Sequence, residues 1–242
     1  MCAGLSLGEY TALAFAGAFS FEDGLRLVKL RGESMQAAAD AAPSGMVSVI
    51  GLSSDKVAEL CEAANKEVGP NEGVQIANYL CNGNYAVSGG IPGCEAVERL
   101  AKGTGQQYGL CTIVYALAVR YCHPFAPDFK ARMTVRLAVA GAFHTAYMQP
   151  AVEKLQEALA ATTIVEPRLA VVSNVDVAPH ADPAVIRAVL AKQVTSPVQW
   201  ETTIKTLVDR GLEEAYELGP GKVIAGIVKR VDKKIPVTNI TA

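Results

Sequence analysis

The pentapeptide Gly4-Leu5-Ser6-Leu7-Gly8 constrains the fold of this chain more than any other feature of its sequence. It has the form G-x-S-x-G, in which a serine lies on a sharp turn from a strand into a helix and only small flanking residues are tolerated. Ser6 would then lie at a helix N-terminus, where the Leu7 backbone N–H and the positive helix end can stabilise an oxyanion. The pattern alone also fits an ordinary glycine-rich helix start. It predicts a serine nucleophile only if a base lies nearby.

The composition favours a soluble protein of mixed α and β structure. Half of the 242 residues are hydrophobic and only 6% are aromatic, and the excess of Ala and Val suits Ala-rich helices packed on Val-rich strands. The formal net charge of -2 gives no extended positive field, so binding to nucleic acid or to an anionic membrane surface is not expected. No apolar run approaches the ~18 residues that a membrane span needs.

The cysteines predict free thiols in a reducing compartment. They show no C-x-x-C spacing and are dilute in a chain of this length, which argues against a disulfide framework. The six residues are Cys2, Cys61, Cys81, Cys94, Cys111 and Cys122.

Residues 1–43 and 140–242 predict one α/β unit. A helix runs to residue 16, and a second helix is capped by Ser20 and closed by a turn at 43–45. Further strands are expected at 169–173 and 215–218, with helices at 149–160, 183–192, 198–209 and 222–231. Strands that alternate with helices predict a parallel sheet with both faces covered.

Residues 44–139 predict a second unit inserted into the first. Strands are expected at 46–52, 74–80, 85–88 and 133–139, and helices at 55–65 and 94–102. The order strand-helix-strand-strand-helix-strand is the ferredoxin-like pattern, a small antiparallel sheet with two helices on one face. Residues 103–128 fit neither unit and are interpreted as an insertion, or as translated sequence that does not belong to the mature domain.

The three histidines are the candidate bases, because a serine hydroxyl is a poor nucleophile until its proton is removed. His123 lies in the anomalous segment, and His180 lies in a polar turn where a solvated ring is the plain interpretation. His144 follows the Val-rich run that ends at Val139, which places it just past a strand end, where open α/β sheets bind ligands. A hydrogen-bonded core histidine is the alternative.

Arg31 is a candidate for binding an anion. It shares a helix face with Leu27 and Ser34, and a buried guanidinium there must find a negative partner. A substrate carboxylate would serve, since the guanidinium can hold it through two parallel hydrogen bonds. A surface arginine paired with a neighbouring glutamate is the alternative.

Five ordered motifs resemble the malonyl-coenzyme A:acyl carrier protein transacylases of fatty acid synthesis. They are GLSLGEY at 4–10, LRG at 30–32, GAFHT at 141–145, QVTSPVQW at 193–200 and ELGPGK at 217–222. The resemblance implies that Ser6 is the acylated nucleophile, His144 its general base and Arg31 the clamp on the malonyl carboxylate. It also implies that the backbone carbonyl of Gln193 orients the His144 ring, so that a side-chain change at Gln193 is expected to be mild.

The implied reaction is a ping-pong transfer from malonyl-coenzyme A, through an acyl-serine, to the phosphopantetheine thiol of acyl carrier protein. No metal or other cofactor is expected. The partners are malonyl-coenzyme A and acyl carrier protein, with no nucleic acid and no membrane, and the complete enzyme is expected to be a monomer. The implied location is the bacterial cytoplasm, or a plastid or mitochondrion.

Three departures from the family pattern define further expectations. An N-terminal segment with a glycine-glutamine-glycine motif, which supplies a second oxyanion donor in the family, has no match here. The chain is therefore expected to be N-terminally truncated, with an α/β-hydrolase-like core that is incomplete. Leu5 stands where the family usually has histidine, and 103–128 breaks the match.

Two other functions remain open from the sequence. The chain could be a catalytically impaired fragment that at most binds the carrier protein, with exposed strand edges that need a partner. It could instead be a serine hydrolase or thioesterase, in which water accepts the acyl group. An acidic residue hydrogen-bonded to His144, in place of the Gln193 carbonyl, would favour the hydrolase.

Overall fold

The computed structural model describes residues 1–103 and 129–241, and these form a mixed α/β fold with parallel and antiparallel strand pairs. Strands β1 (Cys2–Ala3) and β6 (Val171–Val172) pair in parallel. Strands β7 (Ala215–Leu218) and β8 (Val237–Ile240) form a second parallel pair. The first pair leads directly into the serine turn, because β1 ends three residues before Ser6.

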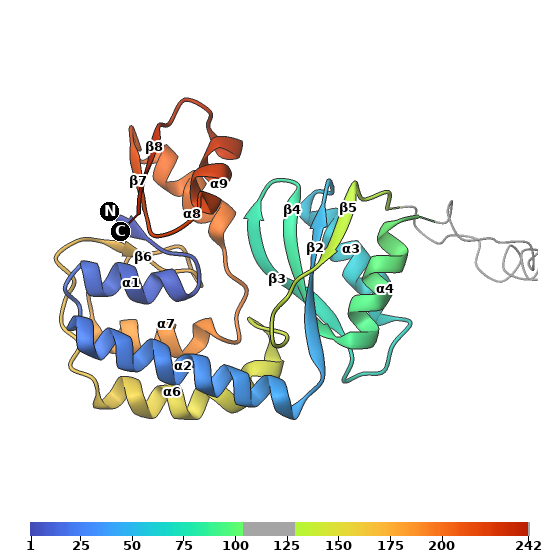
Figure 1. The fold of residues 1–242 in the computed structure, drawn as a ribbon, viewed down its shortest axis with the longest axis horizontal. Coiled ribbons are helices and arrows are strands. Elements are labelled where there is room, and N and C mark those ends of the chain that lie inside the picture. Colours follow the sequence, from blue (N-terminus) through green and yellow to red (C-terminus); the bar gives the residue numbers. More distant parts are fainter. Residues whose placement is uncertain (104–128, 242) are drawn as a thin grey trace, which may run out of the picture.

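Four helices pack around one apolar core beside the β1–β6 pair (Figure 1). They are α1 (Leu7–Phe15), α2 (Phe21–Ala41), α6 (Gln149–Ala161) and α7 (Pro183–Gln193), with the short 3-10 helix η1 (Ala146–Met148) ahead of α6. Ser20 caps α2 as predicted, because its hydroxyl accepts a hydrogen bond from the Asp23 N–H. Apolar side chains from all four helices, including Leu13, Leu27, Leu155 and Leu190, fill this core.

The middle of the chain forms a four-stranded antiparallel sheet with strand order β3-β4-β2-β5. Its elements have the predicted sequence order, and Figure 1 shows both helices on the same side of the sheet. Those elements are β2 (Ser44–Ile50), α3 (Ser54–Asn65), β3 (Val74–Cys81), β4 (Asn84–Gly90), α4 (Ile91–Ala101) and β5 (Met133–Arg136).

The C-terminal helices α8 (Trp200–Asp209) and α9 (Val223–Val231) form a further core with Trp200, Ile204 and Val228. The segment before α8 joins the edge of β3, because Val198 exchanges backbone hydrogen bonds with Ala77 and Tyr79. The sequence predicted that this helix begins at Val198. These bonds explain why it begins at Trp200 instead.

Several sequence expectations are wrong in detail. The described residues hold two separate two-stranded parallel pairs in place of one continuous parallel sheet. The turn expected at 43–45 is not a turn, since Ser44 already begins β2 and pairs with Gly90. The strand expected at 169–173 shortens to Val171–Val172, and β1 and β8 were not predicted. The expectation of an insertion at 103–128 falls almost wholly on residues 104–128, which lie outside the described residues.

Candidate active site

Ser6 lies on a strained turn between β1 and α1. Its backbone has φ 50° and ψ -102°, a left-handed φ that a non-glycine residue rarely adopts. Gly4 makes the turn possible, because a Cβ there would lie 2.0 Å from the backbone carbon of Gly8. Gly8 itself has open space where a Cβ would be, so only the first glycine of the motif is required by packing.

The Ser6 hydroxyl contacts the ring of His144. Ser6 Oγ lies 2.8 Å from His144 Nε2, and His144 Nδ1 lies 2.9 Å from the backbone carbonyl oxygen of Gln193. A carbonyl oxygen can only accept, so Nδ1 carries the proton and Nε2 accepts the hydrogen bond that Ser6 donates. The two side chains that the sequence placed far apart therefore form a serine–histidine pair.

His144 reaches this position from a loop, not from the end of a parallel strand. The strand that precedes it, β5, pairs antiparallel with β2, so the structural reason for choosing His144 from the sequence was wrong. Its backbone has φ 61°, and its N–H donates to the carbonyl of Val194 at the end of α7. The C-terminal end of α7 thus holds both the backbone and the ring of His144.

Burial lowers the pKa of His144 to about 4, against the effect of the Gln193 carbonyl, which raises it. The nearby Arg31 guanidinium lowers it further. The ring is therefore neutral at neutral pH, which is the form that can accept the serine proton.

Arg31 points its guanidinium at the same hydroxyl. Its Nη2 donates to Ser6 Oγ at 2.8 Å and to the side-chain oxygen of Gln193 at 3.3 Å. The guanidinium also lies 5.6 Å from the centre of the Tyr10 ring. Its Nε has no partner among the described residues, and burial lowers the pKa of Arg31. A buried cation with a spare donor beside a nucleophile can bind an anionic group of the molecule that is attacked.

The side chain of Gln193 is part of the site as well as its carbonyl. Its Nε2 donates to the backbone oxygen of Ser6 at 3.0 Å and to Glu9 Oε2 at 2.6 Å, and the residue is fully buried. The expectation that a side-chain change at Gln193 would be mild does not fit these contacts, since removing the amide leaves a carboxylate and a guanidinium with fewer partners.

Sequence reasoning missed Asn174, which holds the serine turn. Its Oδ1 accepts from the Ser6 N–H at 2.6 Å, and its Nδ2 donates to the Gly4 carbonyl at 2.8 Å. Its own N–H donates to Glu9 Oε2 at 3.1 Å. No local pattern marks Asn174, because each of these contacts joins residues about 165 or more positions apart.

Glu9 was also missed, although a signal was present. It follows Ser6 by three residues, which places it on the same face of α1, and a buried carboxylate there needs hydrogen-bond donors. Burial raises the pKa of Glu9 to about 7, while the hydrogen bonds from Gln193 and Asn174 lower it. Glu9 therefore loses its proton in the neutral range.

Leu7 is the first residue of α1, and its side chain is exposed. The first N–H groups of a helix lack acceptors within the helix, and the Leu7 N–H has no hydrogen-bond acceptor among the described residues, so it can donate to an oxyanion next to Ser6.

Of the two remaining histidines, the structure describes only His180, which lies outside this arrangement. His180 Nε2 lies 2.9 Å from Asp176 Oδ2, in the loop after β6. His123 lies outside the described residues.

Two further sequence expectations can be compared with the described residues. Cys2, Cys61, Cys81 and Cys94 are free thiols there. Within 1–103 and 129–241, no helix has the length and apolar character needed to cross a bilayer.

Comparison with known proteins gives consistent matches to one family of enzymes, although no protein-family model matches the chain. The human mitochondrial malonyl-CoA-acyl carrier protein transacylase is 38% identical over 232 residues, which are 94% of this chain and 54% of the human protein. This chain thus spans only about half the length of that relative.

Two solved structures have the same fold. An acyl carrier protein S-malonyltransferase from Vibrio cholerae superposes with a TM-score of 0.81 at 31% identity, covering 98% of this chain and 68% of that one. A malonyl-transacylase in complex with a type II polyketide synthase acyl-carrier protein gives a TM-score of 0.81 at 30% identity, with the same coverage of 98% and 68%.

Proposed function

Since the chain belongs to the malonyl-CoA-acyl carrier protein transacylase family, we propose that it transfers a malonyl group from coenzyme A to the phosphopantetheine thiol of an acyl carrier protein. The observation that carries the proposal is the contact of one hydroxyl, Ser6 Oγ, with both His144 Nε2 and Arg31 Nη2. A base and a cation on one nucleophile suit the attack on an acyl group that carries its own carboxylate.

In the first half of the reaction, Ser6 Oγ attacks the thioester carbonyl while His144 Nε2 takes the hydroxyl proton. The Leu7 N–H, at the start of α1, stabilises the oxyanion of the tetrahedral intermediate. The intermediate then collapses, the carbon–sulfur bond breaks, and the coenzyme A thiolate leaves with the proton from His144. A malonyl ester on Ser6 remains.

In the second half, His144 takes the proton of the carrier-protein thiol, and the sulfur attacks the ester carbonyl. The carbon–oxygen bond to Ser6 breaks, and His144 returns the proton to Ser6 Oγ. The balance closes without an oxidant, a reductant or a metal. The Gln193 carbonyl keeps Nδ1 protonated throughout, so Nε2 is the atom that exchanges the proton.

Arg31 supplies the selectivity for malonyl. Its Nη2 donates to Ser6 Oγ, and its Nε, which has no hydrogen-bond partner among the described residues, can donate to a substrate carboxylate. An uncharged acyl group would leave the cation without an anion, which costs free energy in a buried site.

The proposal also covers how the chain divides into two units. We propose that 1–43 and 140–242 form an α/β-hydrolase-like core and that 44–139 form an inserted ferredoxin-like subdomain. The order β3-β4-β2-β5 with α3 and α4 on one face supports the second assignment. The carrier protein as partner is supported by the solved complex of a related malonyl-transacylase. The monomeric state and the reducing compartment stay predictions.

The hydrolase alternative is less well supported, because His144 Nδ1 contacts a backbone carbonyl where that alternative expects an acidic side chain. Incubating the chain with radiolabelled malonyl-coenzyme A distinguishes them. We expect a malonyl ester on Ser6 that a carrier-protein thiol removes faster than water does. Ser6→Ala must abolish the label. A protein that takes up no label, or an ester that only water removes, would refute the transfer.

A further inference from the structure

The carboxylate of Glu9 is buried in the site, yet no step of the proposed reaction uses it. Glu9 is 3% exposed, and both of its recorded hydrogen bonds reach Oε2, one from Gln193 Nε2 and one from the Asn174 N–H. A buried carboxylate is costly unless donors surround it. Its presence therefore calls for a role.

The Glu9 carboxylate accepts the shortest of the three hydrogen bonds that orient the Gln193 amide. The amide has three polar neighbours: the Ser6 carbonyl oxygen and the ionised Glu9 accept only, and the Arg31 guanidinium donates only. A single orientation satisfies all three. Nε2 must face Ser6 and Glu9, and Oε1 must face Arg31.

The direction of the Arg31 guanidinium depends on that amide. Among the described residues, no carboxylate pairs directly with Arg31. Among the described residues, Nη2 donates to Ser6 Oγ and to Gln193 Oε1, Nε has no hydrogen-bond partner, and the Tyr10 ring lies beside the guanidinium. Glu9 is therefore connected to Arg31 through the intervening amide, which donates to Glu9 and accepts from Arg31.

We propose that Glu9 is a positioning residue for acyl selectivity: it orients the Gln193 amide, and the amide oxygen in turn aims Arg31 at the substrate carboxylate. The proposal rests on the proposed function, since it assigns the residue that sets up the malonyl clamp. In this role the Glu9 carboxylate acts through Gln193 and not on Ser6 Oγ directly.

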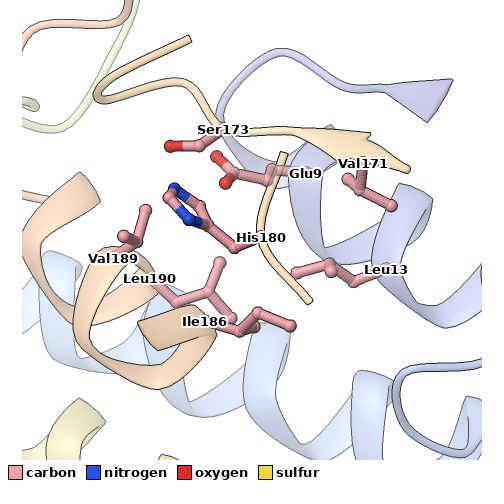
Figure 2. Close-up of a pocket in the computed structure, with 8 residues that line it drawn as sticks. All are labelled: Glu9, Leu13, Val171, Ser173, His180, Ile186, Val189 and Leu190. Carbon is pink, nitrogen blue, oxygen red and sulfur yellow. The ribbon is translucent and has the colours of Figure 1, made fainter. Parts of the chain in front are cut away.

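The far side of Glu9 supports this indirect role (Figure 2). There the carboxylate faces a small pocket, together with the Ser173 hydroxyl and the His180 ring. The rest of the pocket is aliphatic: Leu13, Val171, Ile186, Val189 and Leu190. Neither Ser6 nor Arg31 lines this pocket, and the Glu9 carboxylate is connected to the catalytic groups through Gln193 and Asn174.

The test is a double-mutant cycle on selectivity, measured at pH 8 as the ratio of kcat/KM for malonyl over acetyl thioester. We expect Glu9→Leu to lower the ratio by about tenfold, the size of one misdirected hydrogen bond to a charged group. Gln193→Leu should lower it similarly, and the double variant no further. Glu9→Gln should stay close to the unsubstituted protein, because an amide oxygen can accept both hydrogen bonds.

Equal losses for malonyl and acetyl in Glu9→Leu would indicate a merely structural role and overturn the proposal, as would additive losses in the double variant. Glu217→Leu is the matched control. Its carboxylate also accepts two hydrogen bonds, from the N–H groups of Ile224 and Ala225, and its loss should leave the ratio unchanged. If Glu9→Leu does not fold, Glu9→Asp carries the test, because its shorter side chain withdraws the acceptor, and an unchanged ratio there overturns the proposal.

A second readout does not depend on catalysis. The side-chain ¹⁵N–¹H resonances of Gln193, assigned by their loss in Gln193→Leu, should shift in Glu9→Leu and exchange faster with water. Unchanged resonances would overturn the positioning role even in an active protein. The two proposals can also fail separately. If the unsubstituted protein forms no malonyl ester but the Gln193 resonances still shift in Glu9→Leu, the proposed transfer is refuted and the Glu9–Gln193 coupling stands.

Discussion

Nη2 of Arg31 lies 2.8 Å from Oγ of Ser6, so the cation that is proposed to select the substrate also touches the nucleophile that attacks it. The contact joins a helix residue to the serine turn 25 positions earlier in the chain. Binding of a carboxylate by Arg31 would therefore place the acyl carbonyl next to Ser6, which couples recognition to attack.

Removing the Arg31 guanidinium should change the preference for malonyl over acetyl more than the rate of acyl transfer itself. For Arg31→Ala we expect kcat/KM for malonyl thioester to fall by about 10- to 100-fold, with acetyl transfer maintained, because only malonyl has a carboxylate to lose its partner. Arg26→Ala is the control on the same helix, since Arg26 is exposed and pairs with Asp23. Steady-state kinetics with both thioesters measures the effect, and unchanged discrimination would remove Arg31 from the acyl site.

The acylation step should tolerate mild acid. Because burial lowers the pKa of His144 to about 4, its ring stays neutral well below pH 6.5 and can still accept the serine proton. We expect single-turnover acylation of Ser6 to be constant from pH 8 to about 5.5, and to fall only as the pH approaches 4. The assay uses an uncharged acyl thioester, which has no carboxylate for Arg31 to bind. The rate of acylation then does not respond to the ionisation of Glu9 through Arg31. An inflection of the acylation rate near pH 6.5 would contradict the lowered pKa of His144.

The serine turn should depend on Asn174. Asn174→Ala removes the hydrogen bonds to Ser6 N–H and the Gly4 carbonyl, so we expect acylation to fall about tenfold or more and the free energy of unfolding to fall by about 1–3 kcal/mol.

Asn65 provides the control for Asn174. Its side chain makes the same kind of double contact, with the N–H and carbonyl of Val74, far from Ser6. Asn65→Ala should cost less stability, because Asn65 is exposed, and should leave acylation unchanged. Equal effects of both variants on acylation would show that Asn174 acts on stability alone.

The parts of the site that were predictable from sequence are those set by local geometry. Ser6 followed from the glycine motif, and the buried face of α2 with Leu27, Arg31 and Ser34 followed from helical spacing. His144 does contact Ser6 Oγ, but the reason for choosing it was wrong, since β5 is antiparallel to β2. Asn174 and the Gln193 side chain could not be found, because their contacts with the serine turn cross more than 160 positions and leave no periodicity.

In the fold, too, the elements set by local sequence were predictable and those set by distant contacts were not. Helices with clear amphipathic spacing were placed to within a few residues, as for α3, α6 and α7. The two-residue strand β1 has too few residues for an alternating pattern, and only its pairing with β6 defines it. The pairing of β7 with β8 likewise depends on contacts that the local sequence does not encode.

Glu9 and His144 should give the free energy of unfolding opposite pH dependences that nearly cancel. Burial raises the pKa of Glu9 from 4.5 to about 7, so the folded state binds more protons and stability falls as the pH rises through this window. Burial lowers the pKa of His144 from 6.5 to about 4, so the folded state binds fewer protons and stability rises with pH. Each group contributes up to about 1.4 kcal/mol per pH unit.

Between about pH 4.5 and 6.5 we therefore expect the free energy of unfolding, measured by urea unfolding, to be nearly independent of pH. Glu9→Gln should make stability rise with pH, and His144→Gln should make it fall. The carboxylate of Asp176, whose pKa is lowered from 3.8, acts below this window. Slopes of the same sign in both variants would show that the two buried groups do not titrate in opposite directions.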